Sequence, residues 1–118
     1  MLPKGTKIAE FISQIKFNQY GLVPAIAQDY HSKEVLMLAW MNSETIKISY
    51  NSKIATYFSR SRNEIWQKGK TSGNYQEIIN ITADCDYDCL LINVKQKGNA
   101  CHTGEKTCFF NGVTLENV

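Results

Sequence analysis

All four cysteines of this 118-residue chain lie in one segment, Thr82–Phe110. Cys85, Cys101 and Cys108 follow the pattern C-x15-C-x6-C, and Cys89 comes four residues after Cys85. Thiolates are soft ligands that suit Zn²⁺. No C-x2-C pair occurs, so the common zinc-ribbon and zinc-finger patterns do not fit. A single cysteine is often a small buried hydrophobic residue, but a cluster in a stretch rich in turn residues favours a metal site.

The number of ligands in such a site would decide its role. Four cysteines would form a closed structural zinc site. Three thiolates, or two thiolates with His102, would leave a position for water, whose pKa can fall to about 7 at zinc. Cys85 and Cys89 would share one face of an extended strand, so the spacing alone leaves both alternatives open.

Three aspartates occupy every second position of the sequence DCDYD. In an extended segment Asp84, Asp86 and Asp88 would point the same way and converge. Carboxylates that converge repel one another unless a cation lies between them, and Mg²⁺ or Ca²⁺ prefers oxygen ligands. The segment is not an EF-hand loop, which needs glycine at its sixth position and glutamate at its twelfth. Cys85 would face away from the aspartates, so the sequence predicts two separate metal sites.

The segment SRSRNEIWQKGKTSG has the composition of an anion-binding site. It holds Arg60 and Arg62, the only arginines of the chain. Guanidinium groups bind phosphate through two parallel hydrogen bonds, and hydroxyls with glycine-flanked amides complete an anion-binding nest. The letters GKT resemble the end of a P-loop, but Glu64 stands where the first glycine belongs. Taken alone, the segment is equally consistent with an exposed hairpin of mixed charge.

Two short helices are predicted among the elements that must position these residues. An apolar face formed by Ile8, Phe11, Ile12 and Ile15 predicts an amphipathic helix near the N-terminus. The stretch 42–52 predicts a second helix, with Asn42 or Ser43 as its N-cap.

Short strands dominate the remainder of the chain. Residues rich in β-branched and aromatic side chains predict strands over 22–29, 35–41, 55–60, 64–69, 75–84 and 88–96, and the tail 107–115 would add an edge strand. The joining turns are too short for parallel crossovers. We therefore expect one domain over 1–118 with an α+β fold and a mostly antiparallel sheet.

Composition limits the classes of function. The formal net charge of +2 is weak evidence for a nucleic-acid partner, and the lysines are spread along the chain. No apolar run approaches the ~20 residues that cross a bilayer, and the N-terminus has no signal-peptide core. We expect a soluble cytoplasmic protein, where disulfides are disfavoured and clustered cysteines favour metal binding or catalysis.

From Phe17 to Phe110 the chain resembles the phosphoribosyl-AMP cyclohydrolase family. The stretches LVPAIAQD, VLMLAWMN, YFSRSRNEIWQKGKTSG, DCDYD and ACHTGEKTCFF have the order and spacing of that family. Ile65 stands where leucine is usual and Thr107 where serine is usual. The resemblance implies an intertwined homodimer that needs zinc and magnesium. It also implies a reaction, the hydrolytic opening of the adenine ring of phosphoribosyl-AMP in histidine biosynthesis.

Carried over position by position, the resemblance assigns roles to individual residues. The implied zinc ligands are Cys85, Cys101 and Cys108, with one zinc per subunit shared across the dimer interface. The implied magnesium ligands are Asp84, Asp86 and Asp88. The implied substrate contacts are Arg60, Arg62, Lys70, Thr71, Ser72 and Gly73. Cys89 falls outside the pattern and is interpreted as a strand residue.

The implied reaction attacks C6 of an electron-poor, N1-ribosylated ring and breaks the N1–C6 bond. His102, beside a zinc cysteine, is the candidate for the general base or for a group that polarises the reacting atoms. Magnesium would orient a phosphate or hold a loop. Some relatives carry a fused pyrophosphohydrolase domain, and we expect that activity to come from another protein.

Two rival interpretations remain at this point. A structural-zinc module would close its site with four cysteines and bind nucleic acid through the SRSR segment. A zinc nucleotide deaminase would attack the same kind of carbon and expel ammonia, but its H-x-E and P-C-x-x-C motifs are absent here. The family resemblance instead implies a small-molecule substrate, a homodimer, and no nucleic-acid or membrane partner.

Overall fold

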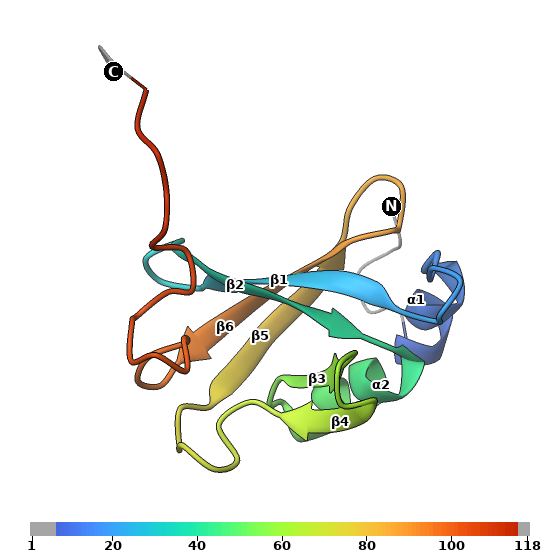
Figure 1. Cartoon of the computed structure of the whole chain (residues 1–118). Helices are drawn as coiled ribbons and strands as arrows, with labels where there is room; N and C mark the ends of the chain where they lie inside the picture. Colours follow the sequence, from blue (N-terminus) through green and yellow to red (C-terminus); the bar gives the residue numbers. More distant parts are fainter. Residues whose placement is uncertain (1–6, 116–118) are drawn as a thin grey trace.

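The computed structural model describes residues 7–115, which form two helices and a six-stranded sheet (Figure 1). In chain order the elements are α1 (Ile8–Gln14), β1 (Val23–Asp29), β2 (Val35–Met41), α2 (Ser43–Ser52), β3 (Thr56–Ser59), β4 (Glu64–Gln67), β5 (Gln76–Ala83) and β6 (Leu90–Gln96). The predicted α+β fold with two short helices is confirmed. The expected domain bounds also include 1–6 and 116–118, which lie outside the described residues.

The sheet is mostly antiparallel, as predicted, with the strand order β4-β3-β2-β1-β6-β5. Four of its five strand pairs are antiparallel, and β1 pairs with β6 in parallel. The prediction considered only the turns between consecutive strands. β1 and β6 are separated by four strands and a helix, so ample chain is available for a parallel return.

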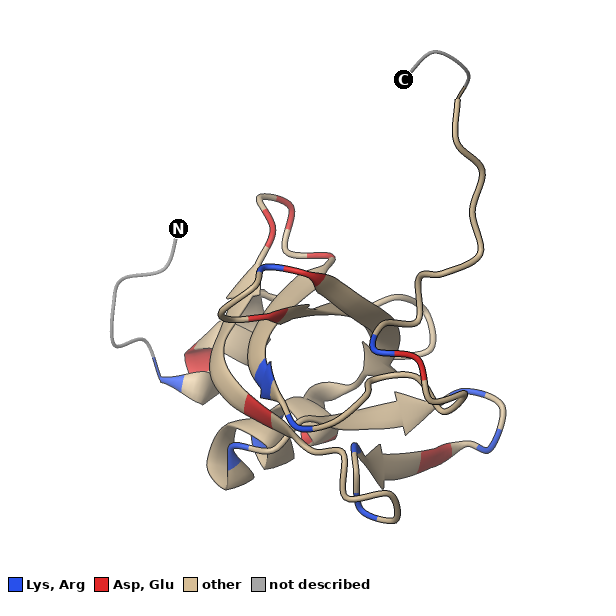
Figure 2. Cartoon of the chain, turned by 90° about the vertical axis from the view of Figure 1, so that its left-hand side faces the viewer, with Lys and Arg blue, Asp and Glu red and all other residues tan. Residues whose placement is uncertain are grey.

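The sheet also curls until β5 meets the segment that precedes β3. The Ala55 N–H donates to the Gln76 carbonyl at 2.9 Å, and the Ile78 N–H donates to the Lys53 carbonyl at 2.8 Å. The pairing register shifts between Ile78 and Asn80, and such a bulge increases the local twist of a strand. Seen from the direction of Figure 2, the strands follow a ring.

Alternating apolar residues of the central strands fill the inside of this curled sheet. The buried side chains include Val23, Ala25 and Ala27 of β1 and Leu90, Ile92 and Val94 of β6. The predicted apolar face of α1 packs on the same core through Ile12 and Ile15. Burial of this alternating face fixes the register of the strands, because a one-residue slip would expose it.

The second helix, α2, begins at a capping box. The Asn42 side chain accepts a hydrogen bond from the Thr45 N–H at 2.8 Å, and the Thr45 hydroxyl accepts one from the Asn42 N–H at 2.9 Å. Of the two predicted N-caps, the structure therefore selects Asn42. The helix ends at Lys53, which has a left-handed backbone with φ of 64°.

The tail prediction was wrong, because residues 107–115 form no strand. The Cys108 N–H donates to the Leu36 carbonyl at 2.8 Å, and the chain then leaves the sheet. A strand needs a continuous partner edge, and within residues 107–115 the hydrogen bonds to β2 end at Cys108. Figure 1 shows the tail extending away from the body, with Val113 and Leu115 exposed.

Neither helix within residues 7–115 has the length and apolar composition needed to cross a membrane.

Candidate active site

A cleft of about 940 Å³ lies beside the β3–β4 hairpin, the loop after β4 and the loop after β6. Of the predicted substrate contacts, Arg62, Lys70, Thr71 and Ser72 line it. Two residues of the predicted metal segment, Cys101 and His102, line the same cleft. The fold therefore brings together the segment predicted to bind an anion and a cysteine–histidine pair that are some 30 residues apart in sequence.

The two arginines of the β3–β4 turn lie in different surroundings. Arg62 lines the cleft, and its guanidinium is 3.9 Å from the Glu64 carboxylate, with both side chains exposed. Arg60 does not line the cleft, and its guanidinium packs over the ring of Trp40, 4.6 Å from the centroid. A cation on an aromatic face is partly held in place already. Arg62 is thus the better placed of the two to bind an anion in the cleft.

A glycine determines the path of the loop after β4. Gly69 has φ of +86°, and a Cβ there would lie 2.5 Å from the backbone of Asn74 and Tyr75. The loop closes through the Gly73 N–H, which donates to the Gly69 carbonyl at 2.7 Å. Gly73 itself does not line the cleft. The loop presents Lys70, Thr71 and Ser72 because only glycine permits this close approach at residue 69.

Cys101 lies at the buried beginning of a compact loop. Its N–H donates to the Glu105 carbonyl at 3.1 Å, and its carbonyl accepts the Gly104 N–H at 3.1 Å. The Thr103 hydroxyl donates to the Cys101 sulfur at 3.0 Å. This hydrogen bond lowers the pKa of the Cys101 thiol, because it stabilises the thiolate. The loop therefore favours the form of Cys101 that binds a metal.

Cys108 returns to the side of Cys101 at the end of the same loop. Desolvation raises the pKa of Cys108, and the neighbouring Cys101 thiol raises it further. The Thr107 hydroxyl donates to the backbone carbonyls of Val35 and Leu36 at 2.8 and 3.1 Å. Threonine here supplies the hydroxyl that serine would supply. The chain thus brings two of the three predicted zinc ligands together.

Cys85 lies at the other end of β6, in the β5–β6 turn (Figure 1). At about 3.3 Å per residue, β6 alone extends for roughly 20 Å between the two regions. Within residues 7–115, only the aspartate group brings three or more His, Cys, Asp or Glu side chains to metal-binding distance of one another. A single copy of the chain therefore does not assemble the three predicted zinc cysteines.

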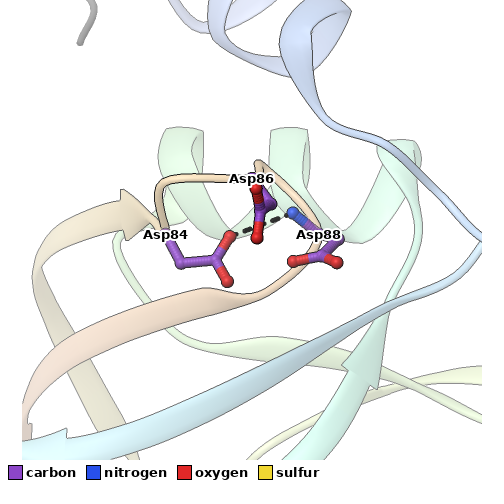
Figure 3. A group of neighbouring side chains, drawn as sticks. All are labelled: Asp84, Asp86 and Asp88. Carbon is purple, nitrogen blue, oxygen red and sulfur yellow. Dashed lines mark hydrogen bonds between the residues drawn. The ribbon is translucent and has the colours of Figure 1, made fainter.

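The three aspartates do converge. One carboxylate oxygen from each of Asp84, Asp86 and Asp88 lies within 4.8 Å of the others, so this exposed group could hold a metal ion (Figure 3). Like-charged neighbours raise the pKa of Asp88, first through its hydrogen bond with Asp84 and then through the charge of Asp84. Figure 2 shows acidic residues gathered on this loop, and none of the three aspartates lines the cleft.

The expected extended geometry of this acidic segment was wrong. Residues 84–88 form a turn in which Tyr87 has φ of 60°. The Tyr87 N–H donates to the Asp84 carbonyl at 3.1 Å, and the Asp88 N–H donates to the Asp84 side chain at 3.1 Å. Hydrogen bonds within the turn, rather than strand alternation, bring the carboxylates together.

The expectation that Cys85 and Cys89 share a strand face was wrong for the same reason. Cys85 lies within the turn, and Cys89 lies just before β6. Cys89 is half-buried, and burial raises the pKa of its thiol, as do the charges of Asp84 and Asp88. Cys89 is not part of the converging acidic group.

Lys68 is a cleft residue to which the sequence assigned no role. Its ammonium donates to the Ala100 carbonyl at 2.5 Å, next to Cys101. Burial lowers the pKa of Lys68, and the nearby Cys108 and Cys101 oppose that shift. The sequence held no signal for this role, because Lys68 lies in the turn after β4, where strand alternation does not apply.

Comparison with known proteins identifies the family. A sequence model described as phosphoribosyl-AMP cyclohydrolase matches residues 37–110, which include both arginines, the aspartates and all four cysteines. The chain belongs to the phosphoribosyl-AMP cyclohydrolase family. Members of this family are hydrolases of histidine biosynthesis, so the cleft belongs to an enzyme with a small-molecule substrate.

Individual relatives are similar over most of the chain. The phosphoribosyl-AMP cyclohydrolase of Roseobacter denitrificans is 52% identical over 92% of this chain and 84% of its own length. That of Archaeoglobus fulgidus is 53% identical over 89% of this chain and 97% of its own length. A histidine biosynthesis bifunctional protein of Caldanaerobacter subterraneus is 54% identical over 89% of this chain and 51% of its own length.

Proposed function

We propose that this chain opens the adenine ring of phosphoribosyl-AMP by hydrolysis of the N1–C6 bond, in the cleft beside Cys101. The observation that carries the proposal is the shared lining of that cleft. Arg62 and Lys70–Ser72 supply groups for anion binding, and Cys101 and His102 supply groups for metal binding and proton transfer. The anion-binding side chains alone would indicate only a phosphate-binding surface, and Cys101 with His102 alone would indicate only a metal site.

The substrate carries a ribose phosphate at each end of its purine. Arg62 offers a planar donor pair to one phosphate, and the Thr71 and Ser72 hydroxyls with the Lys70 ammonium offer further donors on the adjacent loop. These side chains are exposed, so they are free to reorient around the ligand. Their role is to fix the ring against Cys101 and His102, because correct placement supplies much of the rate of such reactions.

The chemistry of the donor groups fits zinc. Cys101 and Cys108 lie together, and the Thr103 hydroxyl favours the thiolate form of Cys101. Zn²⁺ bound by three thiolates would lower the pKa of water to about 7 and polarise the reacting carbon. The third thiolate would be Cys85 of a second copy, because Cys85 of the same chain lies beyond the far end of β6.

His102 is exposed in the cleft lining and is the proposed general base. It would accept a proton from the attacking water as the oxygen bonds to C6. Collapse of the tetrahedral carbon then breaks the N1–C6 bond. The oxygen remains on the new carboxamide, and a proton is delivered to N1. One water molecule is consumed, and no ammonia leaves.

Magnesium is the proposed occupant of the acidic turn. Three carboxylate oxygens suit a hard cation, which would offset the repulsion among these like-charged groups. The turn carries both the aspartates and Cys85. In a dimer that shares its zinc, magnesium on this turn would lie near the partner's cleft and would hold the turn or orient a phosphate.

The test is to incubate the zinc-loaded and magnesium-loaded protein with phosphoribosyl-AMP and record the ultraviolet spectrum. Ring opening changes the chromophore, so a spectral change without ammonia release is expected. Ammonia release would instead show a deaminase. An unchanged spectrum with folded, metal-loaded protein, together with four sulfur ligands by X-ray absorption, would show a structural-zinc protein and contradict the proposal.

A further inference from the structure

We propose that Lys68 is a positioning residue that holds the Cys101–His102 segment against the substrate cleft. The proposal rests on the function proposed above for that cleft. Its basis is a hydrogen bond between segments distant in sequence, in which the Lys68 ammonium donates to the Ala100 carbonyl at 2.5 Å. Ala100 is buried and directly precedes Cys101.

The backbone of Lys68 is fixed to the core. Its N–H donates to the Ala55 carbonyl at 3.0 Å, and the Ala55 N–H donates in turn to the Gln76 carbonyl at 2.9 Å. Ala55 and Gln76 are both fully buried. The next residue, Gly69, makes a contact with Asn74 and Tyr75 that leaves no room for a side chain. Lys68 therefore reaches towards Ala100 from a rigid base.

The loop that Lys68 contacts is held to the sheet at two places. On the Cys108 side, the Cys108 N–H and the Thr107 hydroxyl donate to carbonyls at the beginning of β2, and Lys106 pairs with Glu34 at 3.1 Å. On the Cys101 side, the Gln96 side chain of β6 donates to the Lys97 carbonyl at 2.9 Å, and further along, over the described residues 98–104, the hydrogen bond from outside the loop is that of Lys68 to Ala100. Without it, Ala100 and Cys101 would keep their backbone hydrogen bonds to Lys106 and Glu105 within the loop, but the segment that carries Cys101 and His102 would lose its hydrogen bond to the β4 side of the cleft.

Lys68 differs from Lys70 and Arg62, the other cationic side chains of the cleft, because its ammonium is hydrogen-bonded within the protein. Lys70 and Arg62 are exposed, and neither side chain donates a hydrogen bond of ordinary length within residues 7–115. Lys68 is half-buried and donates to a backbone carbonyl. Lys70 and Arg62 therefore have the freedom that ligand binding needs, whereas Lys68 is engaged within the protein.

The experiment compares Lys68→Met and Lys68→Arg with Lys95→Met, which removes an exposed lysine of β6. In the metal-loaded full chain, Lys68→Met should lower kcat by about 10–100-fold, because a misplacement of about 1 Å can cost that much. The KM for phosphoribosyl-AMP should change little, since the phosphate contacts remain. Lys68→Arg should recover most of the loss, and Lys95→Met should resemble the wild type.

A second measurement needs no substrate. Hydrogen exchange at the Cys101 and Gly104 amides should be faster in Lys68→Met than in the wild type or in Lys95→Met, and the Cys108 amide should change less. Because hydrogen exchange needs no turnover, it tests the role of Lys68 independently of the proposed enzyme activity. An inactive wild type with faster exchange in Lys68→Met would overturn only the function.

Three results would overturn the role of Lys68. A higher KM with unchanged kcat in Lys68→Met would make Lys68 a direct substrate contact. Unchanged kcat per folded, zinc-loaded protein would leave Lys68 with a role in stability alone. Unchanged exchange at Cys101 and Gly104 would show that the loop keeps its position without the hydrogen bond.

Discussion

At the scale of residues, the cleft combines side chains that are free with side chains that are held. Arg62 and Lys70 are exposed, whereas Cys101 is buried and accepts a hydrogen bond from Thr103. If the proposed function is correct, the exposed side chains would adjust to the phosphates of the substrate while the groups proposed to react stay in place. The roles of single residues can therefore be separated by whether a substitution changes KM or kcat.

Arg62→Ala should weaken the binding of phosphoribosyl-AMP by roughly 10–100-fold, the amount expected for hydrogen bonds to a charged group. Arg60→Ala is the matched control. It should have a smaller effect, because Arg60 packs on Trp40 and does not line the cleft. Titration of both variants with substrate at constant zinc content measures the difference. Equal losses in the two variants would assign both arginines to the same phosphate.

His102→Ala should retain its fold and its zinc while kcat falls by roughly 10²–10⁴-fold, the range for a general acid or base. Zinc content and turnover measured on the same sample test this expectation. A loss of zinc in proportion to the loss of activity would show instead that His102 is a metal ligand.

The acidic turn should make stability depend on both pH and magnesium. Because the pKa of Asp88 is raised, protonated Asp88 favours the folded state, and that contribution disappears as pH rises through the raised pKa. At neutral pH without magnesium, Asp88→Asn should therefore be more stable than the wild type. Magnesium should stabilise the wild type and not the variant.

Urea unfolding between pH 4 and pH 7, with and without Mg²⁺, measures this effect, and Glu77→Gln on β5 controls for the loss of an exposed acidic group. Equal stabilisation of Asp88→Asn and the wild type by magnesium would show that the ion does not bind the turn.

At the scale of elements, the central strands could be predicted from the sequence, because every second side chain of a half-buried strand lies in the core. β-branched and aromatic residues predicted both β1 and β6, and in the structure their side chains alternate between buried and partly exposed positions. The tail 107–115 has strand-like composition but lacks a partner edge. Composition reports what a segment favours, and only the assembled sheet shows whether hydrogen-bond partners are available.

The candidate site was predictable to a similar extent. Residue types and spacing predicted the aspartate group, although a turn rather than a strand makes it converge. The different positions of Arg60 and Arg62 depend on the turn and on Trp40, which lies on another strand. The role proposed for Lys68 depends on a contact with Ala100 across 32 residues. Such contacts are properties of the fold, so single-sequence patterns do not contain them.

The loop after β4 gives a prediction at this scale. Gly69→Ala should cost about 1–3 kcal/mol more stability than Gly21→Ala, because a Cβ at residue 69 would overlap the backbone of Asn74. Gly21 is the matched control, since its φ of +74° resembles the +86° of Gly69 but open space surrounds it. Chemical unfolding of both variants measures the difference. Equal losses would show that the loop can move away.

At the scale of the whole molecule, a zinc site made of Cys85, Cys101 and Cys108 would need two copies of the chain. Cys101 and Cys108 lie beside the cleft, and Cys85 lies on the acidic turn beyond the other end of β6. A two-fold dimer in which each turn reaches the partner's cleft would form two equivalent sites. Each site would then combine Cys85 from one copy with Cys101 and Cys108 from the other.

The most direct test of this shared site mixes two variants, Cys85→Ser and Cys101→Ser, each expected to be inactive alone. After unfolding, mixing and refolding with zinc, about half of the dimers should contain one copy of each variant. In a mixed dimer one site receives both substitutions, and the other receives an intact Cys85 and an intact Cys101. Activity should therefore return to about a quarter of that of identically treated wild type. If zinc were bound within one chain, every site would keep its own substitution, and the mixture would stay inactive. An inactive mixture would therefore contradict the shared site.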